Sequence, residues 1–321
     1  MISAVLIPLD GSSIAEQAIP YAQALVPDAD AGVLLRVIPE LDPLLTELMW
    51  TLEAASEPAE TAAARAELDR VKARLAGTRI RWTTDVVQGD PAEEILNAIT
   101  RHRISVVAMT THGRGALGRV TFGSVADRVS RASPIPVLLV RAHPDESALS
   151  SVIIRRLVVP LDGSTRAEAA LPVVVDRAKQ LGIPVHLVRA INLADALTPS
   201  VDRGGMLVSP SPEVCEQMTE AVEHDAREYL TSVAERLADE GISITWDVVE
   251  GSPFFTIAHA TETGDLLVAT SHGRSGVLRW LMGSVAEKLV REAPVPILLV
   301  PSPGRGAATA SADAVAGTVA S

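Results

Sequence analysis

Glycine, serine and arginine residues in an arrangement suited to anion binding occur at two places in the sequence. The stretch Thr111–Val140 reads THGRGALGRVTFGSVADRVSRASPIPVLLV, and Ser271–Val300 reads SHGRSGVLRWLMGSVAEKLVREAPVPILLV. In each copy a glycine is followed by nine residues and then by Gly-Ser at the start of an amphipathic helical pattern. An apolar run that indicates a buried strand precedes each copy. Each copy therefore predicts a strand, a glycine-rich loop and a helix N-terminus.

Both loops have the features of a phosphate-binding site. Gly113 and Gly273 can adopt a positive φ, which lets a ligand approach the backbone closely. A helix N-terminus offers N–H groups and the positive end of the helix dipole to an anion, and each loop adds arginines. The loop residues expected to hold a phosphate are Gly113, Arg114, Gly123, Ser124 and Val125, with their counterparts Gly273, Arg274, Gly283, Ser284 and Val285.

Two roles around these loops stay open at this level. The hydroxyls of Ser124 and Ser284 can cap the helix or donate to a phosphate oxygen. His112 and His272 can contact a phosphate or stabilise the loop through a hydrogen bond. Phosphate binding is favoured because both copies keep the same spacing and the same basic flanks.

Short apolar runs alternate with helical patterns in both halves of the chain. The strands expected are 4–9, 32–37, 80–87, 104–109 and 136–140 in the first half, and 157–161, 184–190, 242–249, 266–269 and 296–300 in the second. The helices expected besides those after the glycine loops are 13–26, 59–76 and 92–101, and 165–181, 213–240 and 254–263. Pro20 and Pro172 fall inside two of these helices and predict a kink in each. The alternation predicts two tandem, doubly wound α/β domains, each with a five-stranded parallel sheet.

The early aspartates and the late glycine loops are predicted to share a crevice. Asp10 and Asp162 each follow the first strand of a half, and the glycine loops follow the fourth strands. Ligands of such sheets bind beyond the carboxyl ends of the strands, where the strand order reverses. A strand order of 3-2-1-4-5 would bring the two motifs together. The aspartates can then contact the ligand or serve only as turn and cap residues.

The expected domains are residues 1–142 and 152–301, with a polar linker at 143–151 and a disordered tail at 302–321. The halves diverge after their second strands, where 39–58 in the first half corresponds to the longer segment 192–212 in the second. That insertion is either a lid over a site or idle surface length.

Composition excludes several classes of protein. The net charge of −12 argues against a nucleic-acid polymer as partner, which would need a basic face. The single cysteine, Cys215, excludes an intrachain disulfide and a cysteine-rich metal site, and the histidines lack zinc-ligand spacing. No apolar run approaches the roughly 18 residues of a membrane span, and no basic segment opens a signal peptide. We therefore expect a cytoplasmic protein.

Both halves resemble universal stress protein domains, and together they resemble the tandem form of that family. The resemblance rests on Pro-Leu-Asp-Gly-Ser after the first strand, at Pro8–Ser12 and Pro160–Ser164, and on the family's Gly-x2-Gly-x9-Gly-Ser/Thr loop. Thr110 and Thr270 replace the first glycine of that loop. The resemblance implies an adenine nucleotide alpha hydrolase-like fold over the whole chain except the tail.

The resemblance also implies ATP as the ligand, and Mg²⁺ could accompany it. Asp10 and Asp162 would contact the adenosine end, the main chain of Val37 and Ala190 would line the adenine pocket, and the glycines and serines would hold the phosphates. The other residues that the resemblance places at the nucleotide are Pro8, Met109 and Thr110, with Pro160, Ala269 and Thr270. The two threonines add side chains near the ribose or phosphates, so they bear on affinity more than on fold.

Two function classes follow. One is a nucleotide-dependent regulator of stress response or growth state, acting through an unidentified protein partner; the absence of a dedicated base–nucleophile pair favours this class over an enzyme. The other is a slow Mg²⁺-dependent ATP hydrolase or nucleotidyl-transfer enzyme that uses Asp10 or Asp162. The family resemblance implies pairing of the two domains through their last strands, and a homodimer would use other surfaces.

Overall fold

The computed structural model describes residues 2–39, 59–111, 122–141, 151–192, 200–201, 207–208, 211–271 and 282–302. Its chain divides into two compact units, one of residues 1–154 with 296–299 and the other of residues 155–295 with 300–321. The expected linker, apart from Ser151, and the expected tail after Ser302 lie outside the described residues. The same holds for most of the 192–212 insertion, in which β8 (Ser200–Val201) and β9 (Leu207–Val208) form an antiparallel pair.

The first repeat forms a parallel sheet in the predicted order. Its strands are β1 (Ala4–Pro8), β2 (Ala31–Ile38), β3 (Arg81–Gln88), β4 (Val106–Thr110) and β5 (Val137–Val140). The sheet runs β3-β2-β1-β4-β5, and every one of these pairs is parallel. In the first unit β5 also pairs antiparallel with residues 297–299, which belong to the last strand that the structure describes.

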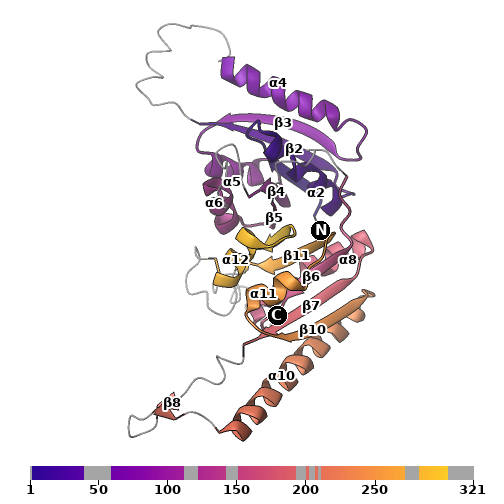
Figure 1. Cartoon of the computed structure of the whole chain (residues 1–321). Coiled ribbons are helices and arrows are strands. Elements are labelled where there is room, and N and C mark those ends of the chain that lie inside the picture. The colour runs from indigo at the N-terminus through magenta and orange to yellow at the C-terminus, as the bar shows by residue number, and fades with distance from the viewer. Residues whose placement is uncertain are drawn as a thin grey trace, which may run out of the picture. The chain divides into compact units, whose positions relative to one another are not determined.

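Helices pack along this sheet (Figure 1). They are α1 (Ser13–Glu16), α2 (Ala18–Leu25), α4 (Ala59–Arg74), α5 (Pro91–Arg101) and α6 (Ser124–Ala132). The helix α4 covers β2 and β3, whereas α5 and α6 contact each other and pack on β1, β2 and β5. Strand β4 is buried along its whole length, as expected for a central strand with both faces covered.

The second repeat has the same organisation. Its strands are β6 (Arg156–Pro160), β7 (Val185–Ile191), β10 (Ile244–Glu250), β11 (Asp265–Thr270) and β12 (Ile297–Val300). Its helices are α7 (Thr165–Glu168), α8 (Leu171–Leu181), α10 (Pro212–Ala238), α11 (Pro253–His259) and α12 (Ser284–Glu292). The strand order β10-β7-β6-β11-β12 repeats 3-2-1-4-5, so the predicted fold class is confirmed in both halves.

The helix after each first strand breaks before its proline rather than at it. In the first repeat α1 ends at Glu16 and α2 begins at Ala18, ahead of Pro20. In the second, α7 ends at Glu168 and Pro172 lies in the first turn of α8. A proline has no N–H to donate to the preceding turn and its ring crowds that turn, so the helix stops and restarts upstream. The predicted interior kinks are therefore breaks between short helices.

Candidate functional site

A cavity of about 650 Å³ lies at the carboxyl ends of β1, β2 and β4 in the first repeat, next to the N-terminus of α6. This is the position at which parallel α/β sheets bind ligands, because strand order reverses between β1 and β4. The described residues that the loop motif and the family resemblance predict for a nucleotide site all line it, namely Pro8, Asp10, Val37, Met109, Thr110, Gly123, Ser124 and Val125. The fold thus brings the early aspartate and the late Gly-Ser together.

The second repeat has a smaller cavity of about 240 Å³ at the equivalent place. Its lining again includes every described residue expected there, namely Pro160, Asp162, Ala190, Ala269, Thr270, Gly283, Ser284 and Val285. The two crevices are therefore equivalent in position and unequal in volume. The remaining predicted loop residues, Gly113, Arg114, Gly273 and Arg274, and the histidines His112 and His272 lie outside the described residues.

Each aspartate is fixed by a turn that opens the next helix. Asp10 Oδ1 accepts hydrogen bonds from the Ser12 N–H, at 2.9 Å, and from the Ser12 hydroxyl. Ser12 in turn caps α1, since its Oγ accepts from the Ala15 N–H at 3.2 Å. Asp162 makes the same 2.9 Å contact with the Ser164 N–H. The turn role predicted for these aspartates is thus present, and it also holds each carboxylate at the cavity wall.

The N-terminus of α6 presents backbone N–H groups without a capping side chain. Gly123 is the N-cap residue and makes no side-chain hydrogen bond, while Ser124 is the first residue of the helix. The second repeat is the same, with Gly283 as N-cap of α12 and Ser284 as its first residue. A capping role for the two serines is therefore wrong. Because the N-caps are glycines, the first-turn N–H groups and the positive end of the helix dipole of α6 and of α12 are directed at the cavities, where they can bind an anion.

The threonines that replace the family glycine are buried beside the cavities. Thr110 is 7% exposed and Thr270 is 8% exposed, and both are the last residues of their strands. Each lines its cavity next to an apolar neighbour, Met109 or Ala269. The larger Met109 thus accompanies the larger cavity, so side-chain size at this position does not account for the difference in volume.

Sequence reasoning missed several lining residues that come from other elements. In the first cavity these include Arg36 on β2, Glu60 on α4, and Pro91 and Ile95 on α5. In the second they include Pro253 and Ile257 on α11. The Gly-x-Pro turns before α5 and α11, at residues 89–91 and 251–253, recur in both halves and could have marked the helix that forms this wall.

The fold agrees with what the chain is similar to. The model of the universal stress protein family matches residues 1–141 and 154–301. Because these two matches span most of the sequence, the chain belongs to the universal stress protein family, as two tandem copies of its domain.

Individual relatives give the same result. A universal stress protein of Mycolicibacterium smegmatis is 26% identical over 302 residues, which cover 92% of this chain and 96% of the relative. One of Mycobacterium tuberculosis is 28% identical over 199 residues, so the match covers 60% of this chain and only 61% of that relative. The crystal structure of a universal stress protein from Archaeoglobus fulgidus covers 93% of this chain and 96% of its own, with 21% identity and a TM-score of 0.61. At that identity the likeness concerns the fold.

No helix in the described part of the chain is both long and apolar enough to cross a membrane.

Proposed function

We propose that this protein binds ATP at the carboxyl edge of its sheets and acts as a nucleotide-dependent regulator of stress response or growth state. The observation that carries the proposal is the first cavity, which joins a fixed carboxylate, an uncapped helix N-terminus and apolar walls in one space. Its volume of about 650 Å³ falls within the roughly 300–1,000 Å³ typical of small-molecule sites.

The residues present suit the parts of a nucleotide. The N–H groups at the start of α6 and the Ser124 hydroxyl would donate to phosphate oxygens. Apolar side chains such as Val37, Met109 and Ile95 offer surface to a purine ring. A Mg²⁺ ion bound with ATP takes most of its ligands from phosphates and water and needs one or two carboxylates, a role for which Asp10 is available at the wall.

Nucleotide binding is tested with the full chain. Mass spectrometry of the nucleotide released by denaturing the purified protein should detect an adenine nucleotide, and titration calorimetry should show ATP uptake. Asp10→Asn keeps side-chain size and removes the charge, so it should weaken Mg²⁺-dependent binding at the first cavity. An ATP affinity too weak to measure in the wild-type chain would reject the proposal.

The same preparation distinguishes a regulator from a slow hydrolase. ADP release from Mg²⁺-ATP should stay at the background rate and be unaffected by Asp10→Asn or Asp162→Asn. Turnover that is rapid and lost in either variant would assign the protein to the hydrolase class instead.

A further inference from the structure

An arginine that occupies the same position in both repeats has different surroundings in each. The register of the first two strands in each repeat aligns Pro8 with Leu35 and Pro160 with Val188. Arg36 and Arg189, the next residues of β2 and β7, are therefore equivalent. Arg36 lines the first cavity, whereas Arg189 is not among the residues that line the second.

In the first repeat the guanidinium of Arg36 has few partners. Its Nη1 donates to the Leu9 carbonyl over a long 3.4 Å, and its Nε is buried without a hydrogen-bond partner. No ion pair to Arg36 occurs among the residues that the structure describes. A buried N–H donor left without an acceptor is destabilising. Arg36 lines the cavity, so a ligand that draws the guanidinium toward it can supply the acceptor that the solvent-sealed Nε lacks.

In the second repeat two residues of α10 contact the guanidinium of Arg189. Arg189 is 9% exposed, lies 5.0 Å from the centre of the Tyr229 ring and donates to Asp225 Oδ2 at 3.3 Å. Tyr229 is itself fixed, because its hydroxyl donates to Glu168 Oε1 at 3.0 Å. Burial and the Glu168 carboxylate raise the pKa of Tyr229 well above its usual range, so it stays neutral.

The sequence of α4 lacks these two partners. Buried residues Ala64, Leu68 and Val71 of α4 follow the same spacing as Ala226, Leu230 and Val233 of α10. The alignment that this spacing defines places Glu67 at the position of Tyr229 and Ala63 at that of Asp225. The neighbouring pair is kept in both repeats, as Arg74–Glu16 and Arg236–Glu168. The difference is thus specific to the residues that contact the arginine.

The position of Arg36 indicates which part of a nucleotide it faces. Strands β2 and β4 flank β1, so their carboxyl ends lie about 10 Å apart. With phosphates at the N-terminus of α6, which follows β4, the nucleoside end extends toward β2. A guanidinium there can stack on a purine ring and donate to its acceptors.

We propose that Arg36 recognises the nucleoside end of the ligand, an inference that rests on the proposed nucleotide binding. The second repeat is then the weaker site, because Tyr229 and Asp225 hold Arg189 away from its cavity. The chain then carries one high-affinity site in the first repeat. The second repeat would serve mainly to complete the fold.

The first test uses the unaltered full chain. Titration calorimetry with ATP should give one tight equivalent, and photolabelling with 8-azido-ATP should modify peptides of the first repeat. Equal labelling of both repeats, or two equivalents of the same affinity, would overturn this inference while leaving the proposed function intact. No uptake at either repeat would overturn both.

Variants then test the two arginines. Arg36→Gln should weaken ATP binding at least about tenfold, whereas its matched control Arg189→Gln should leave ATP affinity within about twofold. Inorganic triphosphate, which lacks the nucleoside, should bind Arg36→Gln and wild type equally. Equal losses of ATP affinity in the two variants, or an equal loss for triphosphate, would contradict the assignment. Circular dichroism and thermal unfolding show that each variant is folded.

A second variant tests the inference through a gain of binding rather than a loss. Asp225→Ala with Tyr229→Leu removes both partners of Arg189, and should increase photolabelling of the second repeat. Unchanged labelling in a folded double variant would show that these side chains do not limit the second site.

Discussion

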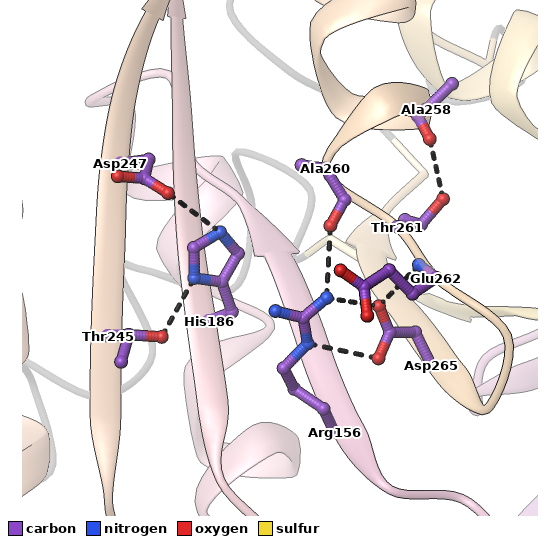
Figure 2. Close-up of polar contacts among 9 residues, drawn as sticks. All are labelled: Arg156, His186, Thr245, Asp247, Ala258, Ala260, Thr261, Glu262 and Asp265. Atoms are coloured by element: carbon purple, nitrogen blue, oxygen red, sulfur yellow. Dashed lines mark hydrogen bonds and ion pairs between the residues drawn. The ribbon is translucent and has the colours of Figure 1, made fainter.

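The two repeats also differ at the opposite end of the sheet, where the parallel strands begin. In the first repeat Ser105 bridges the start of β1, its Oγ accepting from the Ala4 N–H and donating to the Ala4 carbonyl, both at 2.9 Å. In the second, Arg156 and Asp265 take the places of Ala4 and Ser105 and form an ion pair (Figure 2). A neutral bridge in one repeat is thus a charged pair in the other.

That charged pair belongs to a larger polar cluster. Arg156 donates to both oxygens of Asp265, at 3.0 and 2.6 Å, and to the Ala260 carbonyl at 3.2 Å. The Glu262 N–H donates to the same carboxylate at 2.8 Å. The hydrogen bond with Asp265 raises the pKa of Arg156. On the neighbouring strand, His186 contacts Thr245 at 2.9 Å and Asp247 at 3.5 Å (Figure 2).

The comparison shows that equivalent strands can be held at their starts by different chemistry without altering strand order. The carboxyl edge, where both cavities lie, keeps the same residue types in the two repeats at the aspartate, the threonine and the Gly-Ser. At the opposite edge the equivalent residues Ala4 and Arg156, and Ser105 and Asp265, differ in chemical type. The following predictions test how far this holds.

The largest effect is expected from the partly buried Arg156–Asp265 ion pair. Asp265→Asn should lower the free energy of unfolding by about 2–3 kcal/mol, because Asp265 is 4% exposed and the substitution leaves the Arg156 guanidinium without its charged partner. The matched change in the first repeat, Ser105→Ala, should cost only about 1 kcal/mol. Urea unfolding measures both, and hydrogen exchange assigns each loss to its unit. Equal costs would show that the charged pair adds nothing over the neutral bridge.

A pH-dependent effect is expected from His186. Burial, followed by the nearby charge of Arg156, lowers its pKa against the opposing pull of Asp247 and Asp265. A lowered folded-state pKa means that the unfolded state takes up the proton first. The contribution of neutral His186 to the free energy of unfolding is therefore complete above the unfolded-state pKa of 6.5. It is lost as the pH falls from that value toward the folded-state pKa.

The first repeat supplies the control for this titration. Val33 occupies the position of His186 in the strand register, so His186→Val should make stability less dependent on pH between 7.5 and 5.5. Thermal unfolding of the second unit at the two pH values gives the comparison. An identical pH dependence in wild type and variant would contradict the assignment to His186.

The smallest effect is expected where the helices beside each cavity meet. Arg128 on α6 pairs with Asp90 Oδ2 at 2.7 Å, and its counterpart Lys288 on α12 lies 4.5 and 4.8 Å from the rings of Phe254 and Phe255. Lys288→Gln should cost about 0.5–1 kcal/mol at any salt concentration. Arg128→Gln should have a smaller effect that vanishes in high salt, since its ion pair is exposed.

Urea titrations at low and high salt measure these two variants side by side. A strong salt dependence for Lys288→Gln, or none for Arg128→Gln, would show that the two helix contacts are not distinguished in this way.

The sequence alone predicts most of the strands, helices and turns, because the residue patterns that specify them are local. Apolar runs such as Ala4–Leu9 must be buried, and the matching loops at 111–140 and 271–300 predict one unit written twice. The position of Asp10 at a strand end and of Gly123 at a helix start follows from turn and cap chemistry, which depends on a few neighbouring residues. The strand order 3-2-1-4-5 was only the condition under which the two motifs meet, and the structure shows that order in both repeats.

Only the tertiary structure decided what surrounds those residues. The sequence shows Arg36 and Arg189 as similar arginines on similar strands, yet one faces a cavity and the other is held by Tyr229, 40 positions further along the chain. It likewise gives two copies of one motif, while the enclosed volumes are about 650 and 240 Å³. Local sequence sets which groups a strand end carries. Packing between distant helices and strands sets which of those groups remain available to a ligand, and no local pattern encodes that.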